Sequence, residues 1–304
     1  MMKFLKLLHP ISLSSMGKTI YFIGFIAFFS LSGCQANEIS TDAVPAQIVT
    51  TPTITATSLE VEKTSTPEPT PEILPVQATE VAVHLCSPFL DVEVRSLPEL
   101  ITNPFHPPAP GSDDPHQGID LSRMVNVGDT RIAVKGDVVT SLTEGQVAAT
   151  IHDRFPYGNA ILIEIPLKLL PKDTKDQIIF QSPLKPTKPS LSCPETNGSA
   201  EISGDEESLY ILYAHLESLE QVKVTDPVYC GQPLGIVGDS GNALNPHLHL
   251  EMRIGPAGIT FAGMSHYDNS ATSEEMAAYC TWRVSGKFQL VDPLKFIELG
   301  QSWD

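Results

Sequence analysis

The clearest pattern of hydrophobic and polar positions lies near residue 250. Three polar residues, His247, His249 and Glu251, alternate there with leucine and methionine. This two-residue period predicts a β-strand with both imidazoles on one face, where they can reach one metal ion or one substrate. On its own, a His-x-His pair is better explained as a strand with two polar residues facing solvent. The rest of the chain decides between these interpretations.

Short apolar runs recur through much of the remaining sequence. Glycines and a Tyr157-Gly158-Asn159 turn separate them, and short strands with regular turn signals predict an all-β domain. The expected strands cover residues 132–134, 138–142, 147–151, 160–165, 209–216, 228–237 (as a pair) and 246–254.

Two segments depart from this pattern. Residues 166–208 are rich in Pro, Lys and Ser, and we interpret them as an irregular insertion between two strands. Residues 273–280 (SEEMAAYC) begin like a helix, with Ser273 as the expected N-cap and two acids in the first turn. The expected architecture is therefore an all-β domain with an insertion and a short C-terminal helix.

The N-terminal region has a different composition. Residues 1–19 carry three lysines and no acid, and residues 20–31 are almost wholly apolar (IYFIGFIAFFSL). A basic region followed by an apolar run shorter than the ~20 residues that cross a bilayer is typical of a secretory signal. The run ends in Leu31-Ser32-Gly33-Cys34, which resembles the bacterial lipobox, in which the cysteine is lipidated and becomes the mature N-terminus. The alternative is an ordinary signal peptide or an uncleaved anchor with a chance cysteine.

Residues 34–84 are expected to form a tether. They are rich in Thr, Pro and Glu, and the prolines oppose helices and central strands, so we interpret them as disordered or partly extended. Such a segment would separate its ends by roughly 40 Å as a random coil and about 150 Å as polyproline II. We therefore expect a signal peptide over 1–33, the tether over 34–84 and a globular domain over 85–304. The domain would be extracytoplasmic, held at a bacterial membrane by lipid on Cys34.

Cysteines and charge narrow the class of protein further. With Cys34 assigned to the lipid, an even number of cysteines remains in an exported domain, so two disulfides are expected. Of the three connectivities we favour Cys193–Cys230 with Cys86–Cys280, because Cys193 lies in the insertion. A four-cysteine zinc site is the alternative, although the sequence has no Cys-x-x-Cys pair. A net charge of −17 without a basic stripe argues against nucleic-acid binding.

Three separated pieces of the chain carry metal-binding residue types. Catalytic zinc takes three protein ligands from His and carboxylate groups and leaves a fourth position open. A peptide hydrolase also needs a base for the attacking water and a donor for the oxyanion. Four histidines and one aspartate suffice for these roles, and Gly118 would let the backbone turn between two of them. The pieces are His116-x-Gly-x-Asp120, Tyr-Ala-His215-Leu and His247-x-His249.

In their order, these pieces resemble the lysostaphin/LytM-type zinc endopeptidases. The matching elements are His-x-Gly-x-Asp, Tyr-Gly-Asn, Tyr-Ala-His-Leu, Gly-x-x-Gly-x-x-Gly and His-Leu-His-x-Glu, within residues 103–297 apart from 166–208 and 255–287. The resemblance implies a compact antiparallel β-domain with a duplicated hybrid motif and one Zn²⁺ in a groove. It implies that His116, Asp120 and His249 hold the zinc. His215 and His247 would be the catalytic pair, with His247 as general base and His215 stabilising the oxyanion.

Family members cut peptide cross-links of bacterial peptidoglycan, so the resemblance implies a lipid-anchored endopeptidase with that substrate. Glu251 matches the motif but lies outside the ligand set, and we expect it either to support a ligand or to have a structural role. Some family members have lost ligands, so the alternative is a non-catalytic peptidoglycan-binding or hydrolase-activating lipoprotein. Every ligand position is filled in this sequence, which favours the enzyme.

Overall fold

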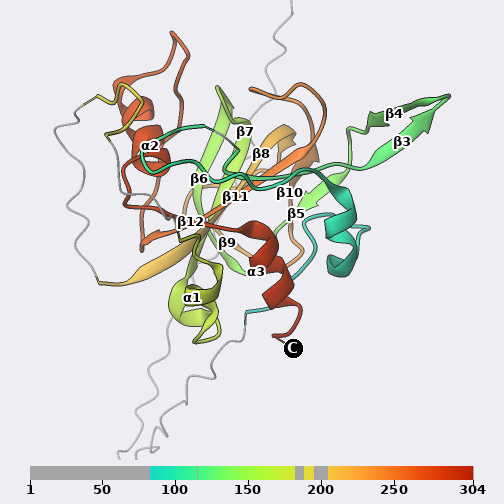
Figure 1. Ribbon diagram of the computed structural model, residues 1–304, viewed down its shortest axis with the longest axis horizontal. Helices are drawn as coiled ribbons and strands as arrows, with labels where there is room; N and C mark the ends of the chain where they lie inside the picture. Colours follow the sequence, from blue (N-terminus) through green and yellow to red (C-terminus); the bar gives the residue numbers. More distant parts are fainter. Residues whose placement is uncertain (1–82, 115, 182–187, 195–204, 304) are drawn as a thin grey trace, which may run out of the picture. The chain divides into compact units, whose positions relative to one another are not determined.

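The computed structural model describes residues 83–114, 116–181, 188–194 and 205–303 (Figure 1). The predicted signal peptide, Cys34 and tether residues 34–82 lie outside these ranges. Within them, no helix is long and apolar enough to cross a membrane.

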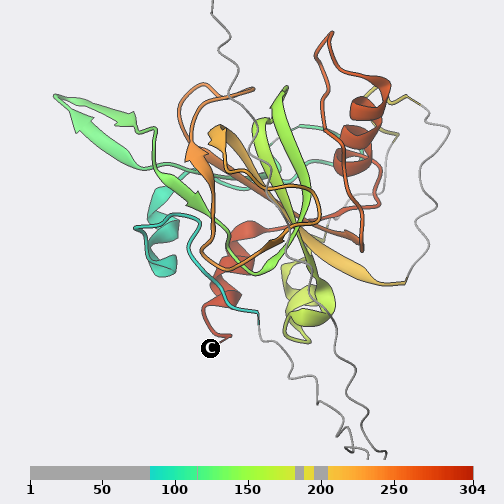
Figure 2. The same ribbon diagram turned by 180° about the vertical axis from the view of Figure 1, so that it is seen from behind.

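An antiparallel sheet organises the described part of the chain. Its main path is β1 (Ile101–Asn103), β2 (Gly118–Leu121), β11 (Leu248–Pro256), β8 (Glu207–Leu219), β7 (Gly158–Pro166), β6 (Gly145–Arg154) and β9 (Pro227–Val228). Off this path, β10 (Pro233–Val237) pairs with β5 (Val138–Thr140) and β8, and β12 (Gln289–Val291) pairs with β11. Each of these pairings is antiparallel, which confirms the predicted all-β class. A separate hairpin, β3 (Met124–Val127) with β4 (Thr130–Ala133), projects from the body (Figures 1 and 2).

The two faces of the sheet pack against different helices. Ile119 of β2 and Leu250 of β11 belong to a core that includes Phe296 of α3 (Pro293–Gly300) and Leu97 of the 3-10 helix η1 (Val94–Leu100). Because side chains alternate along a strand, Asp120, His249 and Glu251 point to the opposite face. That face carries the second core, which includes Trp282 of α2 (Ser273–Arg283). The candidate ligands therefore share a face with α2.

Both faces of β11 are covered. Its residues from Leu248 to Gly255 are all buried, so the strand is not half-exposed as the simpler interpretation of its alternation would require. The polar residues of this strand consequently need partners inside the protein.

Helix α2 begins one residue away from the expected cap. Thr272, rather than Ser273, is the N-cap: its side chain accepts from the Glu275 backbone N–H, and the Glu275 carboxylate accepts from the Thr272 N–H. This reciprocal capping box satisfies two otherwise unpaired donors, which a Ser273 cap could not do with the same glutamate.

The region predicted as an insertion lies between two neighbouring strands. β7 ends at Pro166 and β8 begins at Glu207, and the two strands pair along most of their length. Between them the chain forms a 3-10 turn, η2 (Leu167–Leu169), and a short helix, α1 (Thr174–Ile178). Residues 182–187 and 195–204 of this region lie outside the described ranges.

The predicted disulfide connectivity is wrong. The pairs are Cys86–Cys230 and Cys193–Cys280. Cys86 and the turn carrying Cys230 both hydrogen-bond to residues 141–142, which places these two cysteines side by side. Cys193 joins the insertion to α2, which carries Cys280. All four cysteines form disulfides, as expected, so a four-cysteine zinc site is excluded in this structure.

Candidate metal centre

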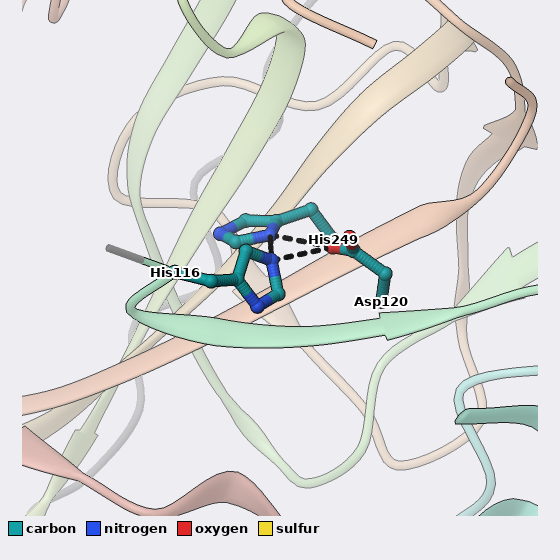
Figure 3. Close-up of side chains that lie close together, drawn as sticks. All are labelled: His116, Asp120 and His249. Atoms are coloured by element: carbon teal, nitrogen blue, oxygen red, sulfur yellow. Dashed lines mark hydrogen bonds and ion pairs between the residues drawn. The ribbon is translucent and has the colours of Figure 1, made fainter. Parts of the chain in front are cut away.

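Three side chains meet above β2 and β11 (Figure 3). Asp120 Oδ1 lies 2.9 Å from His116 Nε2 and 2.9 Å from His249 Nδ1, and the two nitrogens are 3.1 Å apart. Asp120 on β2 is paired in register with His249 on β11, and His116 lies in the loop just before β2. Strand pairing thus brings together residues that are 129 positions apart in the sequence.

Gly118 lets the two strands approach. A Cβ at this position would lie 2.4 Å from the Leu250 carbonyl oxygen and 2.9 Å from Cε1 of His249. We expected this glycine to provide a turn between His116 and Asp120, but it lies in β2 as an extended residue. Its role is to leave room for His249.

His116 and Asp120 are each held from the side away from the cluster. His116 Nδ1 lies 3.0 Å from the Pro104 carbonyl oxygen, and Asn103 Nδ2 donates to Asp120 Oδ2 at 3.1 Å. A carbonyl oxygen can only accept, so the proton of neutral His116 is on Nδ1 and its Nε2 lone pair points inward. Such outer partners orient metal-binding side chains and raise their basicity.

His249 is held by Glu251. His249 Nε2 lies 3.5 Å from Glu251 Oε2, which leaves Nδ1 directed at the cluster. Glu251 is fully buried, and it accepts hydrogen bonds from Arg253, Arg283 and Tyr157. Of the two roles expected for Glu251, its position beside His249 favours support of a predicted ligand.

The electrostatics of the cluster favour a cation. Burial alone would raise the pKa of Asp120, but hydrogen bonds from His116 and His249 hold that pKa well below its usual range. Burial likewise acts to raise the pKa of Glu251, and the guanidinium groups of Arg283 and Arg253 outweigh it and hold the pKa low. Burial acts to lower the pKa of His249, but Asp120 and Glu251 raise it to about 9. Two ionised carboxylates therefore favour positive charge at this point, which a proton or a metal ion can supply.

The donor set fits zinc. Two imidazole nitrogens and one carboxylate oxygen lie within 4.8 Å of one another. Catalytic zinc sites use such ligands and keep a position open, whereas Ca²⁺ and Mg²⁺ prefer oxygen ligands. The residues that would hold the ion are His116, Asp120 and His249.

His215 and His247 lie next to this cluster. Their ring centroids are 4.8 Å apart, and the His215 ring is 5.6 Å from that of His249. His247 Nε2 lies 3.5 Å from Asp120 Oδ1. Each Nδ1 lies close to a backbone carbonyl oxygen, that of Ser240 for His215 (2.8 Å) and that of Asn245 for His247 (2.7 Å). In each neutral ring the proton is therefore on Nδ1, and Nε2 is the nitrogen that can accept a proton.

The backbone at His215 is in a left-handed conformation, with φ of 64°. Such conformations in a residue other than glycine are uncommon and cluster at functional sites. The His215 N–H donates to the Tyr157 carbonyl, and the β7–β8 register shifts nearby. Burial lowers the pKa of His215 to about 3, so the ring is neutral near pH 7.

Two glycine turns position the carbonyl that holds His215. A Cβ on Gly158 would lie 2.3 Å from Ser240 Oγ, and a Cβ on Gly241 would lie 2.4 Å from the Gly158 nitrogen. Ser240 Oγ also accepts from the Asn159 N–H. The Tyr-Gly-Asn turn and the last glycine of the Gly-x-x-Gly-x-x-Gly run therefore act together on His215.

All five sequence-predicted side chains line one cavity of about 1190 Å³. Arg131 of the β3–β4 hairpin, Asp113 and Tyr267 also line this cavity. A cavity of this size can accept an extended peptide.

A model of peptidase family M23 matches residues 195–261, which include His215, His247 and His249. This segment is similar to the peptidases of family M23. The match confirms the resemblance to lysostaphin/LytM-type peptidases that the motifs indicated. A comparison with curated protein sequences gave no match.

Solved structures similar to this chain include M23 proteins and a zinc peptidase. The catalytic domain of lysostaphin from Staphylococcus simulans is 18% identical over 68% of this chain and 98% of that chain, with a TM-score of 0.33. A variant catalytic domain of the prophage-encoded M23 protein EnpA from Enterococcus faecalis is 21% identical over 60% of this chain and 93% of that chain, with a TM-score of 0.30. A zinc-containing peptidase from Vibrio cholerae is 22% identical over 50% of this chain and 32% of that chain, with a TM-score of 0.27. At these TM-scores, the chemistry of the site rests on its own geometry.

Several residues of the site had no signal in the sequence. Asn103 and Pro104 have the sequence of an ordinary turn. In the structure Asn103 is the last residue of β1, which pairs with β2, and Pro104 follows directly after that strand. Arg283 lies in residues 255–287, outside the motif resemblance, and nothing in its sequence context links it to Glu251.

Proposed function

We propose that this chain is a zinc-dependent endopeptidase that hydrolyses peptide cross-links of bacterial peptidoglycan. The observation that carries the proposal is the convergence of His116 Nε2, Asp120 Oδ1 and His249 Nδ1 at one point. It occurs in a chain with an M23 segment, beside two further histidines, in a cavity that a peptide can enter.

His116, Asp120 and His249 would hold the zinc. When bound, the ion would polarise the scissile carbonyl and lower the pKa of the attacking water. Hydrogen bonds to Pro104 and Asn103, together with the ion pair between His249 and Glu251, keep the three side chains directed at it.

His247 is the proposed general base. Its Nδ1–H is fixed on the Asn245 carbonyl, so Nε2 can take the proton that the water loses and return it to the leaving amine. The imidazolium formed in between lies 3.5 Å from Asp120 Oδ1, and that carboxylate stabilises its charge.

The oxyanion-stabilising role of His215 remains a prediction and requires a second proton on that ring. While its Nδ1–H is directed at Ser240, a neutral His215 offers Nε2 as an acceptor and not as a donor. In the neutral form, His215 can instead assist His247 in accepting the proton from water.

The N-terminal sequence supports lipid anchoring through Cys34 on the outer side of a bacterial membrane. The tether over 34–84 would then let the peptidase domain reach the cell wall, with an end-to-end distance of roughly 40 Å as a random coil. A Cys34→Ser variant that still fractionated with membranes as the unchanged protein does would contradict this part.

The enzyme proposal is tested with purified peptidoglycan. Zinc-loaded protein is incubated with and without a chelator, and released fragments are analysed by mass spectrometry. We expect chelator-sensitive release, with fragment masses that identify the bond cut. A His152→Ala variant is the control, because this exposed histidine is not among the residues lining the cavity. Folded, zinc-bound protein that releases nothing would favour a non-catalytic peptidoglycan-binding or activating role.

A further inference from the structure

Helix α2 brings one charged side chain to the metal centre. Arg283 is the last residue of the helix, and its side chain is 10% exposed. The helix is fixed by its N-terminal capping box, by the Cys193–Cys280 disulfide and by the buried Trp282. Because α2 belongs to residues 255–287, the motifs that indicated the catalytic site do not include it.

The guanidinium group of Arg283 bridges two carboxylates. Its Nη1 donates to Glu251 Oε2 at 2.8 Å, and its Nε donates to Asp113 Oδ1 at 2.6 Å. Its Nη2 donates to the Asp113 backbone carbonyl at 2.8 Å. All three guanidinium nitrogens are thus used, in a planar arrangement that lysine cannot reproduce.

Glu251 connects Arg283 to the metal centre. Its Oε1 accepts from Arg253 Nε at 2.7 Å, whereas its Oε2 accepts from Arg283 and from the Tyr157 hydroxyl. The same Oε2 is the atom that faces His249 Nε2 at 3.5 Å. Arg283 therefore holds the carboxylate oxygen that orients the His249 ring.

Asp113 fixes the other side of Arg283. Its Oδ2 accepts from the hydroxyls of Tyr279 at 2.8 Å and Tyr267 at 2.9 Å. Asp113, Tyr267 and Arg283 all line the cavity. A continuous set of polar contacts thus runs from the cavity wall through the hydrogen bonds of Arg283 and Glu251 to the ion pair between Glu251 and His249.

We propose that Arg283 is a positioning residue of the metal centre: it holds Glu251 so that His249 keeps Nε2 on that carboxylate and directs Nδ1 at the ion. The inference rests on the proposed function of His249 as a zinc ligand. It makes α2 a required part of the metal centre in this chain. Without Arg283, Arg253 can draw the Glu251 carboxylate toward itself, and the His249 ring loses its fixed partner.

The test compares zinc affinity in the full-length protein by competition with a chromophoric chelator. Arg283→Met removes the charge and the hydrogen bonds but keeps the length of the side chain. We expect its zinc affinity to fall by about 10–100-fold, as for other outer partners of metal ligands. Arg283→Lys, which keeps the charge without the planar contacts, should lie between Arg283→Met and the unchanged protein. The absorption spectrum of the Co²⁺-substituted protein should change in the same order.

A matched control distinguishes the positioning of Glu251 by Arg283 from a general role of Arg283 in holding α2 against the sheet. Arg154 pairs with Glu275 of the same helix at 2.7 Å, and it is not among the residues lining the cavity. Arg154→Met should therefore lower the thermal stability but leave the zinc affinity and the Co²⁺ spectrum unchanged. Adding guanidinium ion to Arg283→Ala should recover part of the lost affinity.

The outcomes distinguish this inference from the proposed function. Equal zinc affinity in Arg283→Met, Arg154→Met and the unchanged protein would overturn the role of Arg283. If Arg283→Met does not fold, an Arg283→Lys variant with unchanged affinity and spectrum would overturn it as well. Zinc binding by the unchanged protein without peptidoglycan cleavage would contradict only the enzyme proposal. An unchanged protein that binds no zinc would overturn both.

Discussion

At the residue scale, the site depends on which nitrogen each imidazole turns inward. His116 directs Nε2 at the cluster because Nδ1 is held by Pro104, and His249 directs Nδ1 because Glu251 faces Nε2. His215 and His247 have Nδ1 on backbone carbonyls and leave Nε2 for proton transfer. His116, His215 and His247 therefore share one arrangement, with Nδ1 on a backbone carbonyl, and His116 differs from the other two because its Nε2 faces Asp120 and His249 at short distance.

Gly118 provides a prediction at this scale. In Gly118→Ala, the new Cβ would meet the Leu250 carbonyl and the His249 ring, so β2 and β11 must separate. We expect a loss of roughly 1–3 kcal/mol in the free energy of unfolding, and a zinc affinity lower by about 10-fold or more. Denaturant unfolding and chelator competition measure the two effects.

Gly128→Ala is the control for this prediction. Gly128 also has a constrained backbone, with φ of 61°, but a Cβ there would meet nothing within 4 Å. It should lower stability while leaving zinc affinity unchanged. Equal zinc affinity in both variants would show that the close approach at Gly118 does not matter for the centre.

The candidate ligands and catalytic histidines could be predicted from sequence because they lie in short motifs. Their outer partners could not, since these are backbone carbonyls, or residues such as Arg283 that become neighbours only through the fold. The role expected for Gly118 was wrong for a related reason: a glycine needed for close approach looks the same in sequence as one needed for a turn.

At the element scale, the pairing of β2 with β11 brings the candidate ligands together, and α2 packs on the same face. Most central strands were predicted because apolar runs buried on both faces stand out between glycine turns. β2 was not predicted, because Gly118 and Asp120 gave it the character of a loop, and α3 was not predicted either. The disulfide pairs were wrong because connectivity depends on which loops the sheet places side by side.

The disulfides provide a prediction at this scale. Replacing both Cys193 and Cys280 by serine should cost roughly 2–5 kcal/mol of stability, because the bridge closes 87 residues of sequence. It should also weaken zinc binding, since it releases α2, which carries Arg283. The double variant Cys86→Ser, Cys230→Ser should lower the stability but have little effect on the zinc affinity. Unfolding curves and chelator competition on both double variants check this, and an equal loss of zinc affinity in both would contradict it.

At the scale of the whole molecule, zinc binding and folding should be coupled. The three candidate ligand atoms come from two strands and a loop that meet only in the folded sheet. An ion that binds only the folded state should add about 2.7 kcal/mol of stability at a concentration 100-fold above its dissociation constant. A chelator should reverse the gain.

Thermal unfolding with and without zinc measures this effect. Asp120→Ala is the matched variant, because it removes the carboxylate oxygen that contacts both His116 and His249 and that we propose as a zinc ligand. It should show no stabilisation by zinc. Equal stabilisation of both proteins would show that zinc binds elsewhere.

The division of the five residues into three ligands and two catalytic groups is tested most directly by His249→Ala and His247→Ala, measured side by side. Zinc content and peptidoglycan cleavage are determined on the same preparations. The account predicts that His249→Ala loses both, whereas His247→Ala keeps its zinc and loses about 10²–10⁴-fold in turnover. Full cleavage by His247→Ala, or full zinc content in His249→Ala, would contradict the account.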